Sequence, residues 1–159
     1  MQPNLRSVQD AFFEAMAAGW AQNVQKTAIA EMPGSKAIPF TWGDFRVLDC
    51  YLVTPHSDKS AGMTTIWHHD QPVWVMHYGG RYAKVAVPFL KQCLHRAYVE
   101  ERRFYGGRGP WFVRDERFTY ENRITRDSFA DFEGEERVYD LNEQLLGYHW
   151  YRGMSLLKS

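Results

Sequence analysis

The order and spacing of the apolar segments constrain the fold of this chain more than any other feature. Two segments with the period of a helix, at about residues 7–30 and 87–99, are each followed by shorter segments that alternate like β-strands. Most connections between those strands are too short for crossover helices. Sequential strands must then pair antiparallel. This predicts an α+β fold with a curved, mainly antiparallel sheet and two α-helices covering one face, in the order α-β-β-β-α-β-β-β.

Both helices carry end signals. The first is predicted over Ser7–Ala30, with Ser7 as its cap and Pro33-Gly34 as its stop. The second is predicted over Val87–Val99, where Pro88 suits the first helical turn. Each segment has an apolar stripe of spacing three and four, so each helix should bury one face.

The strands are predicted from alternation and from β-branched and aromatic content. They are Arg46–Val53, Met63–Trp67, Pro72–Tyr78, Trp111–Val113, Arg117–Ile124, Ser128–Phe132, Glu135–Tyr139 and Gln144–Arg152. Thr54–Ala61 is predicted to be a polar loop. Gly79-Gly80 is predicted to end the strand Pro72–Tyr78. No internal repeat and no linker is apparent, so residues 1–159 are predicted to form a single domain, with an N-terminal helix (1–30) and an α+β core (33–153).

Charge and composition exclude several classes of protein. The 19 basic and 19 acidic residues balance, which argues against disorder and against non-specific nucleic-acid binding. No segment has the length and apolarity of a membrane helix, and the N-terminus lacks a signal-peptide pattern. We therefore expect a cytoplasmic protein that binds neither nucleic acid nor membrane, with Cys50 and Cys93 as free thiols.

A histidine-rich connector, His68-His69-Asp70, raises the question of a metal site, because imidazole and carboxylate groups suit zinc or iron. Adjacent strand residues point to opposite faces, so His68 and His69 can share an ion only if the turn re-aims one of them. The simpler interpretation is a polar hairpin turn. We therefore predict no metal and no cofactor.

A glycine-rich loop, Gly106-Gly107-Arg108-Gly109-Pro110, is followed by a predicted strand and not by a helix. It therefore lacks the context of a phosphate-binding loop. Arg108 can clamp a carboxylate, either of a ligand or of the protein itself. A salt bridge within the protein is the favoured alternative.

Three carboxylates surround Gly134, with Glu133 and Glu135 on one face of the strand and Glu136 on the other. A buried Glu135 would act as general acid or base, and His149 is the second candidate for this role. The alternative for the glutamates is a charged edge strand. His149 belongs to Tyr148-His149-Trp150-Tyr151-Arg152, a segment that suits a ligand-binding wall, an interface or the core.

Several blocks in fixed order resemble the bacterial family known as domain of unknown function 5680. They span about residues 33–153 and are Pro33-Gly34-Ser35-Lys36, Trp42-Gly43-Asp44-Phe45, Asp49-Cys50-Tyr51, Pro72 to Gly80, Phe89-Leu90-Lys91, Arg108-Gly109-Pro110, Phe118-Thr119-Tyr120, Phe132 to Glu136 and Tyr148 to Gly153. The resemblance implies no particular activity. Family members often form the C-terminal half of helix-turn-helix regulators; the single predicted N-terminal helix departs from that pattern, so DNA binding is not carried over.

The aromatic and titratable residues on predicted strands favour binding of a small molecule on the open face of the sheet. The predicted ligand-binding residues are Trp74, Met76, Tyr78, Arg108, Tyr120, Glu135, His149 and Tyr151. One alternative is a small enzyme that uses Glu135 or His149 as general acid or base. Another is a homodimeric interaction module that uses the Trp/Tyr/Arg face.

Overall fold

The computed structural model describes residues 2–21 and 24–158. Its helices and strands are α1 (Leu5–Ala21), β1 (Ser35–Trp42), β2 (Phe45–Val53), β3 (Lys59–His68), β4 (Gln71–Tyr82), α2 (Val87–His95), β5 (Phe112–Arg114), β6 (Phe118–Ser128), β7 (Asp131–Asp140) and β8 (Leu145–Ser155). A π-helical turn, Arg96–Glu100, extends α2, and a 3₁₀ turn, Tyr105–Gly107, follows it.

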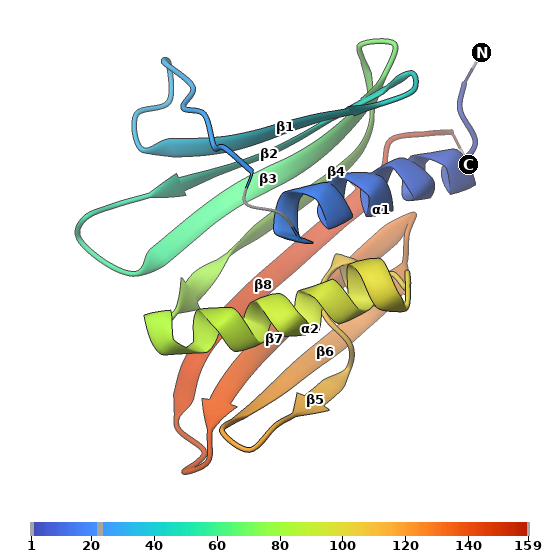
Figure 1. The fold of residues 1–159 in the computed structure, drawn as a ribbon. Helices are drawn as coiled ribbons and strands as arrows, with labels where there is room; N and C mark the ends of the chain where they lie inside the picture. Colours follow the sequence, from blue (N-terminus) through green and yellow to red (C-terminus); the bar gives the residue numbers. More distant parts are fainter. Residues whose placement is uncertain (1, 22–23, 159) are drawn as a thin grey trace.

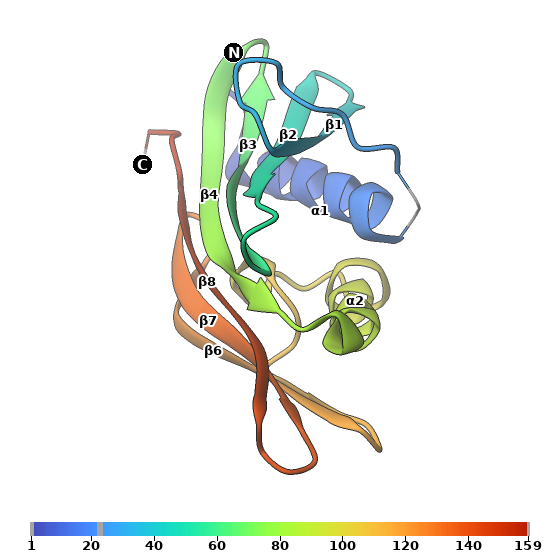
Figure 2. The ribbon, with the colours of Figure 1, turned by 90° about the vertical axis from the view of Figure 1, so that its left-hand side faces the viewer.

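All strands form one antiparallel sheet of eight strands in the order β1-β2-β3-β4-β8-β7-β6-β5. Figures 1 and 2 show both helices on the same side of the sheet, which curves toward them, with α1 over the first strands and α2 over the last ones. We call this side the concave face and the other the convex face. The predicted α+β class, the antiparallel pairing and the two covering helices are confirmed. Among the described residues, no helix is long and apolar enough to span a membrane.

The first helix is shorter than predicted. It ends at Ala21, and Thr27 instead forms an isolated antiparallel bridge with Ala37 of β1, through N–H···O bonds of 2.9 and 2.8 Å. The sheet edge thus satisfies backbone groups that a longer helix would have used. At the other end the N–H of Ser7 donates to the Asn4 side chain (2.8 Å), so Asn4 and not Ser7 is the capping residue.

Strand β1 was not predicted, because Pro39 interrupts its pattern. Proline is tolerated in edge strands, and β1 is an edge strand with Pro39 opposite Leu48. The predicted break at Gly79-Gly80 was also wrong, since β4 continues to Tyr82. A Cβ at Gly79 would lie 2.6 Å from the Trp150 ring, so the glycine is needed for close packing of the strands.

The two predicted strands Ser128–Phe132 and Glu135–Tyr139 were wrong as separate elements. Ser128 ends β6, a two-residue turn follows, and β7 runs without a break from Asp131 to Asp140. Gly134 lies inside β7 because a Cβ there would lie 2.2 Å from the Tyr151 hydroxyl oxygen. The absence of a side chain at this position is therefore a requirement of packing within the strand.

Aromatic rings fill the space between the helices and the sheet. Phe12 of α1 makes edge contacts with Phe104 and Phe129, with ring centroids 5.6 and 6.0 Å apart. Trp74 of β4 stacks on Phe129 and Phe132, at 5.0 and 5.2 Å, and its Nε1–H donates to the Phe129 carbonyl (2.9 Å). Burial of such rings is the main stabilising contribution to a fold of this kind. Cys50 and Cys93 are free thiols, as predicted.

The chain contains two similar halves that the sequence did not reveal. Each half is a helix followed by four strands that pair in sequence order, and the fourth strands, β4 and β8, join the halves as antiparallel neighbours. Tyr78 of β4 lies opposite Tyr151 of β8, as a two-fold axis between them requires. The register shift after Ile66 in β3 recurs after Val138 in β7. Corresponding residues of the two halves can therefore be compared directly.

Candidate functional site

Polar side chains from both halves meet under the helices at the centre of the concave face. We call this group the interior polar cluster; its members are Asp49, Thr64, Tyr78, Tyr82, Tyr98, Arg108, Tyr120, Asn122, Glu136, His149 and Tyr151. All are buried except Tyr82, which is partly exposed, while its hydroxyl donates to Glu136.

A buried ion pair between Arg108 and Glu136 lies at the centre of the cluster. The Arg108 side chain is 4% exposed and Glu136 is not exposed at all. Arg108 Nε donates to Glu136 Oε1 (2.9 Å), and Nη2 donates to the same oxygen. The hydroxyls of Tyr82 and Tyr120 also donate to this carboxylate. These charge-assisted bonds offset part of the large cost of taking both charges out of water.

The ionisation of Glu136 follows from these contacts. Burial alone would raise the pKa of the Glu136 carboxyl, but the charge of Arg108 and the donated hydrogen bonds hold it below its ordinary value. Burial and the neighbouring Glu136 charge raise the pKa of Tyr82 and of Tyr120, so both phenols keep their protons and donate. Glu136 is therefore a carboxylate at neutral pH.

The loop that carries Arg108 is fixed by the sheet. Gly106 and Gly107 have φ angles of 66° and 83°, in the left-handed region that favours glycine, and turn the chain so that Arg108 points inward. Asn122 of β6 donates through Nδ2 to the carbonyls of Tyr105 (3.0 Å) and Gly109 (2.7 Å). Both ends of the turn are thus held against β6, which positions the guanidinium over Glu136.

His149 of β8 is the least satisfied member of the cluster. Its ring packs against Tyr78 and Tyr82, with centroid distances of 5.5 and 5.1 Å. Both ring nitrogens are buried, and neither has a hydrogen-bond partner among the described residues. Burial, and then the positive charge of Arg108, lower the pKa of His149 to about 3. At neutral pH its imidazole is uncharged and offers one donor and one acceptor.

The first half contributes a second buried carboxylate, Asp49 of β2. It accepts hydrogen bonds from the Tyr78 hydroxyl and from Thr64 Oγ1 (3.1 Å). Burial raises the pKa of Asp49 above its ordinary value. A small cavity of about 10 Å³ lies between this carboxylate and α1, against Met16 and Ile38. That volume is about the space of one water molecule.

The predicted ligand-binding residues fall into three groups. Tyr78, Arg108, Tyr120, His149 and Tyr151 lie together in the interior polar cluster. Trp74 and Met76 are buried on the same face, in the aromatic core. Glu135 lies on the convex face, where it pairs with Arg137. The face of the sheet predicted to be open is thus covered by the helices, and the favoured salt bridge of Arg108 with a protein carboxylate is confirmed.

Sequence reasoning missed six members of the cluster: besides Thr64 and Tyr98, which donate to Asp49 and to the Gly107 carbonyl, it missed four residues around the two buried carboxylates and the Arg108 loop. Glu136, Tyr82, Asp49 and Asn122 were not proposed as site residues. For Glu136 a signal was present, since strand alternation places it on the same face as Phe132 and Val138. Tyr82 was missed because β4 was expected to end at the glycines before it.

The histidine-rich connector lies away from the interior polar cluster, at one end of the sheet. There the carboxylate of Asp44 and the imidazoles of His68 and His69 approach closely enough to hold a metal ion. Within the interior polar cluster the described side chains bring no comparable set of metal ligands together.

Comparison with known families supports the resemblance seen in the sequence. Comparison with curated proteins and with solved structures returned no match. The family model described as domain of unknown function DUF5680 matches residues 55–155, from the loop before β3 to the end of β8. The match includes the Arg108 loop, Glu136 and His149. Because it covers well over half of the chain, this chain belongs to the family of domain of unknown function DUF5680.

Proposed function

We propose that the interior polar cluster binds a small uncharged molecule, with His149 as the residue that forms its hydrogen bonds. The observation that carries this proposal is the pair of buried ring nitrogens of His149 that no described residue satisfies. An unmade hydrogen bond at a buried polar group costs ~1–3 kcal/mol. A ligand that supplies a partner to His149 recovers that energy on binding.

The chemistry around His149 selects the kind of ligand. The imidazole is uncharged at neutral pH and presents one N–H and one lone pair. The charges of Arg108 and Glu136 balance each other, so the surroundings favour neither an anion nor a cation. The rings of Tyr78 and Tyr82 on either side suit an apolar or planar body. We infer that such a molecule enters beside Tyr82, the partly exposed member of the cluster.

Native mass spectrometry of the freshly purified chain tests this proposal. We expect a discrete mass above the 18.7 kDa chain in the wild-type protein. We expect this mass to be absent in His149→Met, which replaces the imidazole by an apolar side chain. His77→Met is the matched control, because His77 is exposed on the convex face of β4. A bare wild-type chain, or equal retention by His149→Met, contradicts the proposal.

Acid–base catalysis by Glu135 and His149 has weaker support. Glu135 lies on the convex face in an ion pair with Arg137. A pKa of about 3 leaves His149 far from the near-neutral value that suits a general acid or base. A catalytic role would need a substrate that restores the basicity of the imidazole.

The second candidate function is self-association through the convex face. Leu52, Met63, Trp150 and Met154 are 40–48% exposed there, the first two on adjacent strands β2 and β3 and the last two on β8, with β4 between them. Exposed apolar side chains that gather on one sheet face are typical of protein interfaces. The same mass spectrum reports the subunit number, and a dimer that Trp150→Ala converts to a monomer would favour this function.

A further inference from the structure

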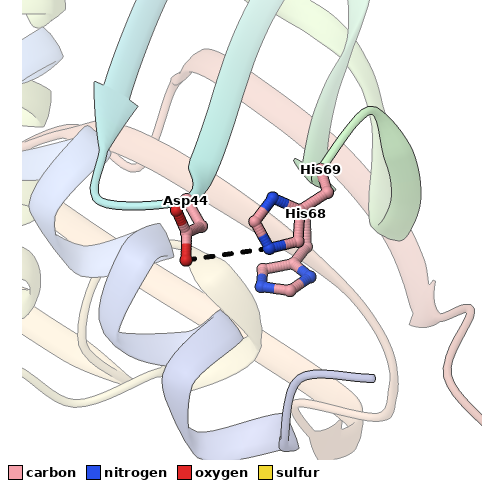
Figure 3. A group of neighbouring side chains, drawn as sticks. All are labelled: Asp44, His68 and His69. Atoms are coloured by element: carbon pink, nitrogen blue, oxygen red, sulfur yellow. Dashed lines mark ion pairs between the residues drawn. The ribbon is translucent and has the colours of Figure 1, made fainter. Parts of the chain in front are cut away.

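Two hairpin turns at one end of the sheet bring together three side chains that can bind a metal ion. Asp44 lies in the turn between β1 and β2, His68 is the last residue of β3, and His69 begins the turn to β4. One ligand atom from each lies within 4.8 Å of the other two. Figure 3 shows the carboxylate facing the two imidazoles, with His69 Nε2 3.7 Å from Asp44 Oδ2.

The backbone of the β3–β4 turn is what brings the two histidines together. His69 and Asp70 have φ angles of 47° and 62°, so both central residues of this two-residue turn are left-handed. Such turns favour Asn-Gly, and a histidine and an aspartate there carry conformational strain. Regular strand geometry would point neighbouring side chains to opposite faces. The turn instead brings the ring centroids of His68 and His69 to 4.1 Å from each other. The turn therefore re-aims one of the two histidines, which is the condition under which His68 and His69 can share an ion.

The contacts around the turns hold the two hairpin tips in place. The N–H of His69 donates to the carbonyl of Asp44 (3.3 Å), which ties one turn to the other. The His68 ring packs on Phe45, at a centroid distance of 5.0 Å, and Phe45 is itself buried. Two of the three ligands are thus positioned by the backbone and by packing before any ion binds.

Among the acidic side chains near the two histidines, Asp44 is the one that faces them. Asp70, the carboxylate adjacent to them in sequence, pairs instead with Arg46 (3.5 Å), and the Arg46 guanidinium lies over the Trp67 ring (4.8 Å). The carboxylate available to His69 therefore comes from the other hairpin, 25 residues earlier in the chain. That separation is why the sequence pattern alone did not identify the site.

We propose that Asp44, His68 and His69 bind a divalent transition-metal ion, for which Zn²⁺ is the probe. Two imidazole nitrogens and one carboxylate oxygen are a common set of protein ligands for zinc, with a fourth position left to water. Bonds of ~2.0–2.2 Å bring the ligand atoms closer together than they are in this structure. Side-chain rotation achieves this, because the His69 and Asp44 side chains are 63% and 67% exposed.

The hollow beside the histidines gives the site room for a further ligand. His68 and His69 line a surface pocket of about 430 Å³ that continues along Pro72, Val73 and Leu157. A donor group of a small molecule can displace the water at the fourth position and place its apolar part there. The site is independent of the interior polar cluster, so either proposal can fail alone.

Isothermal titration calorimetry of the tag-free chain with Zn²⁺ tests this inference. We expect one strong equivalent in the wild type and at least a tenfold weaker affinity in His69→Asn and in Asp44→Asn. Asparagine tolerates the left-handed conformation, so His69→Asn removes the imidazole and keeps the turn. His95→Gln is the matched control, because His95 pairs with Glu100 (3.3 Å) in an exposed contact like that of His69 and Asp44. Its affinity should equal that of the wild type.

The remaining outcomes overturn the inference. Absence of a strong equivalent in the wild type means that the cluster is only a surface ion pair. Equal affinity of the wild type and of a His68→Gln/His69→Asn double variant means that other surface histidines bind the zinc. The absorption spectrum of bound Co²⁺ provides a check that does not depend on variants, since a site with two imidazoles and a carboxylate gives an intense visible band only when its coordination is tetrahedral.

Discussion

Substitution of His149 by methionine should stabilise the protein, and by more at acidic pH than at neutral pH. Methionine is the residue at the corresponding position of the other half, Met76, where it is 2% exposed among apolar side chains. The substitution removes two buried nitrogens that no described residue satisfies. At ~1–3 kcal/mol for an unsatisfied group, less some misfit of the new side chain, we expect a gain of about 2 kcal/mol at pH 7.5.

The pH dependence follows from the shift in the pKa of His149. The pKa is about 3 in the folded chain, against ~6.5 for an unperturbed histidine in the unfolded chain. Between these values the unfolded state binds the extra proton, so the wild type loses stability as pH falls from about 6.5 toward 3. At pH 5 that loss is about 2 kcal/mol, from ~1.4 kcal/mol for each pH unit below 6.5. His149→Met lacks this loss, so its advantage should grow to about 4 kcal/mol.

Urea unfolding at pH 7.5 and pH 5, on protein shown by mass to carry no ligand, measures both quantities. Every other ionisable side chain is present in both proteins, so the difference between variant and wild type reports the contribution of His149. His77→Met should stay within ~0.5 kcal/mol of the wild type at both pH values, because its side chain is exposed. A variant no more stable than the wild type, with the same difference at both pH values, would refute the reasoning that His149 is buried and unpartnered.

Three further substitutions test the packing and charges around the site. Glu136→Gln leaves Arg108 buried without its counter-charge and should cost about 3–5 kcal/mol in urea unfolding; a cost below 1 kcal/mol would mean that the pair is solvated. Gly134→Ala should cost more than ~2 kcal/mol, because the new Cβ would overlap the Tyr151 hydroxyl; an unchanged thermal midpoint would contradict this contact. Asp49→Asn should stabilise the chain by about 1 kcal/mol at pH 7 and have no such effect near pH 3. Burial raises the pKa of Asp49, so the cost of burying its charge lowers the stability of the wild type once pH rises above the pKa of the unfolded state; a destabilised variant at pH 7 would refute this.

The fold could be predicted from local patterns where these determine the structure by themselves. Alternation and helical period identified the order of the elements and the antiparallel pairing, because short connections leave no other way to join the strands. The errors occurred where tertiary contacts decide. Pro39 is tolerated because β1 is an edge strand. Glycine is required at position 134 inside β7 because the Tyr151 side chain occupies the space that a Cβ would need.

The candidate site was predicted in part. Arg108 and His149 were identified from residue type and context, and both lie in the interior polar cluster. Glu135 was proposed, whereas the buried glutamate of the cluster is its neighbour Glu136; a shift of one residue along a strand exchanges the two faces of the sheet. Whether the aromatic face is open or covered depends on where α1 and α2 dock, and no local pattern contains that information.

The pairing of β4 with β8 has a consequence for how this chain folds. Every other strand pair joins neighbours along the sequence, whereas this pair joins segments such as Tyr78 and Tyr151 that are far apart in it. Pairing of segments far apart in the sequence is slow, so the hairpins within each half can form before β4 pairs with β8. Tyr82 comes from the first half, while Glu136 and His149 come from the second. Docking of the two halves should therefore be the late, rate-limiting event, and a chain stalled before it would have its secondary structure but no interior polar cluster.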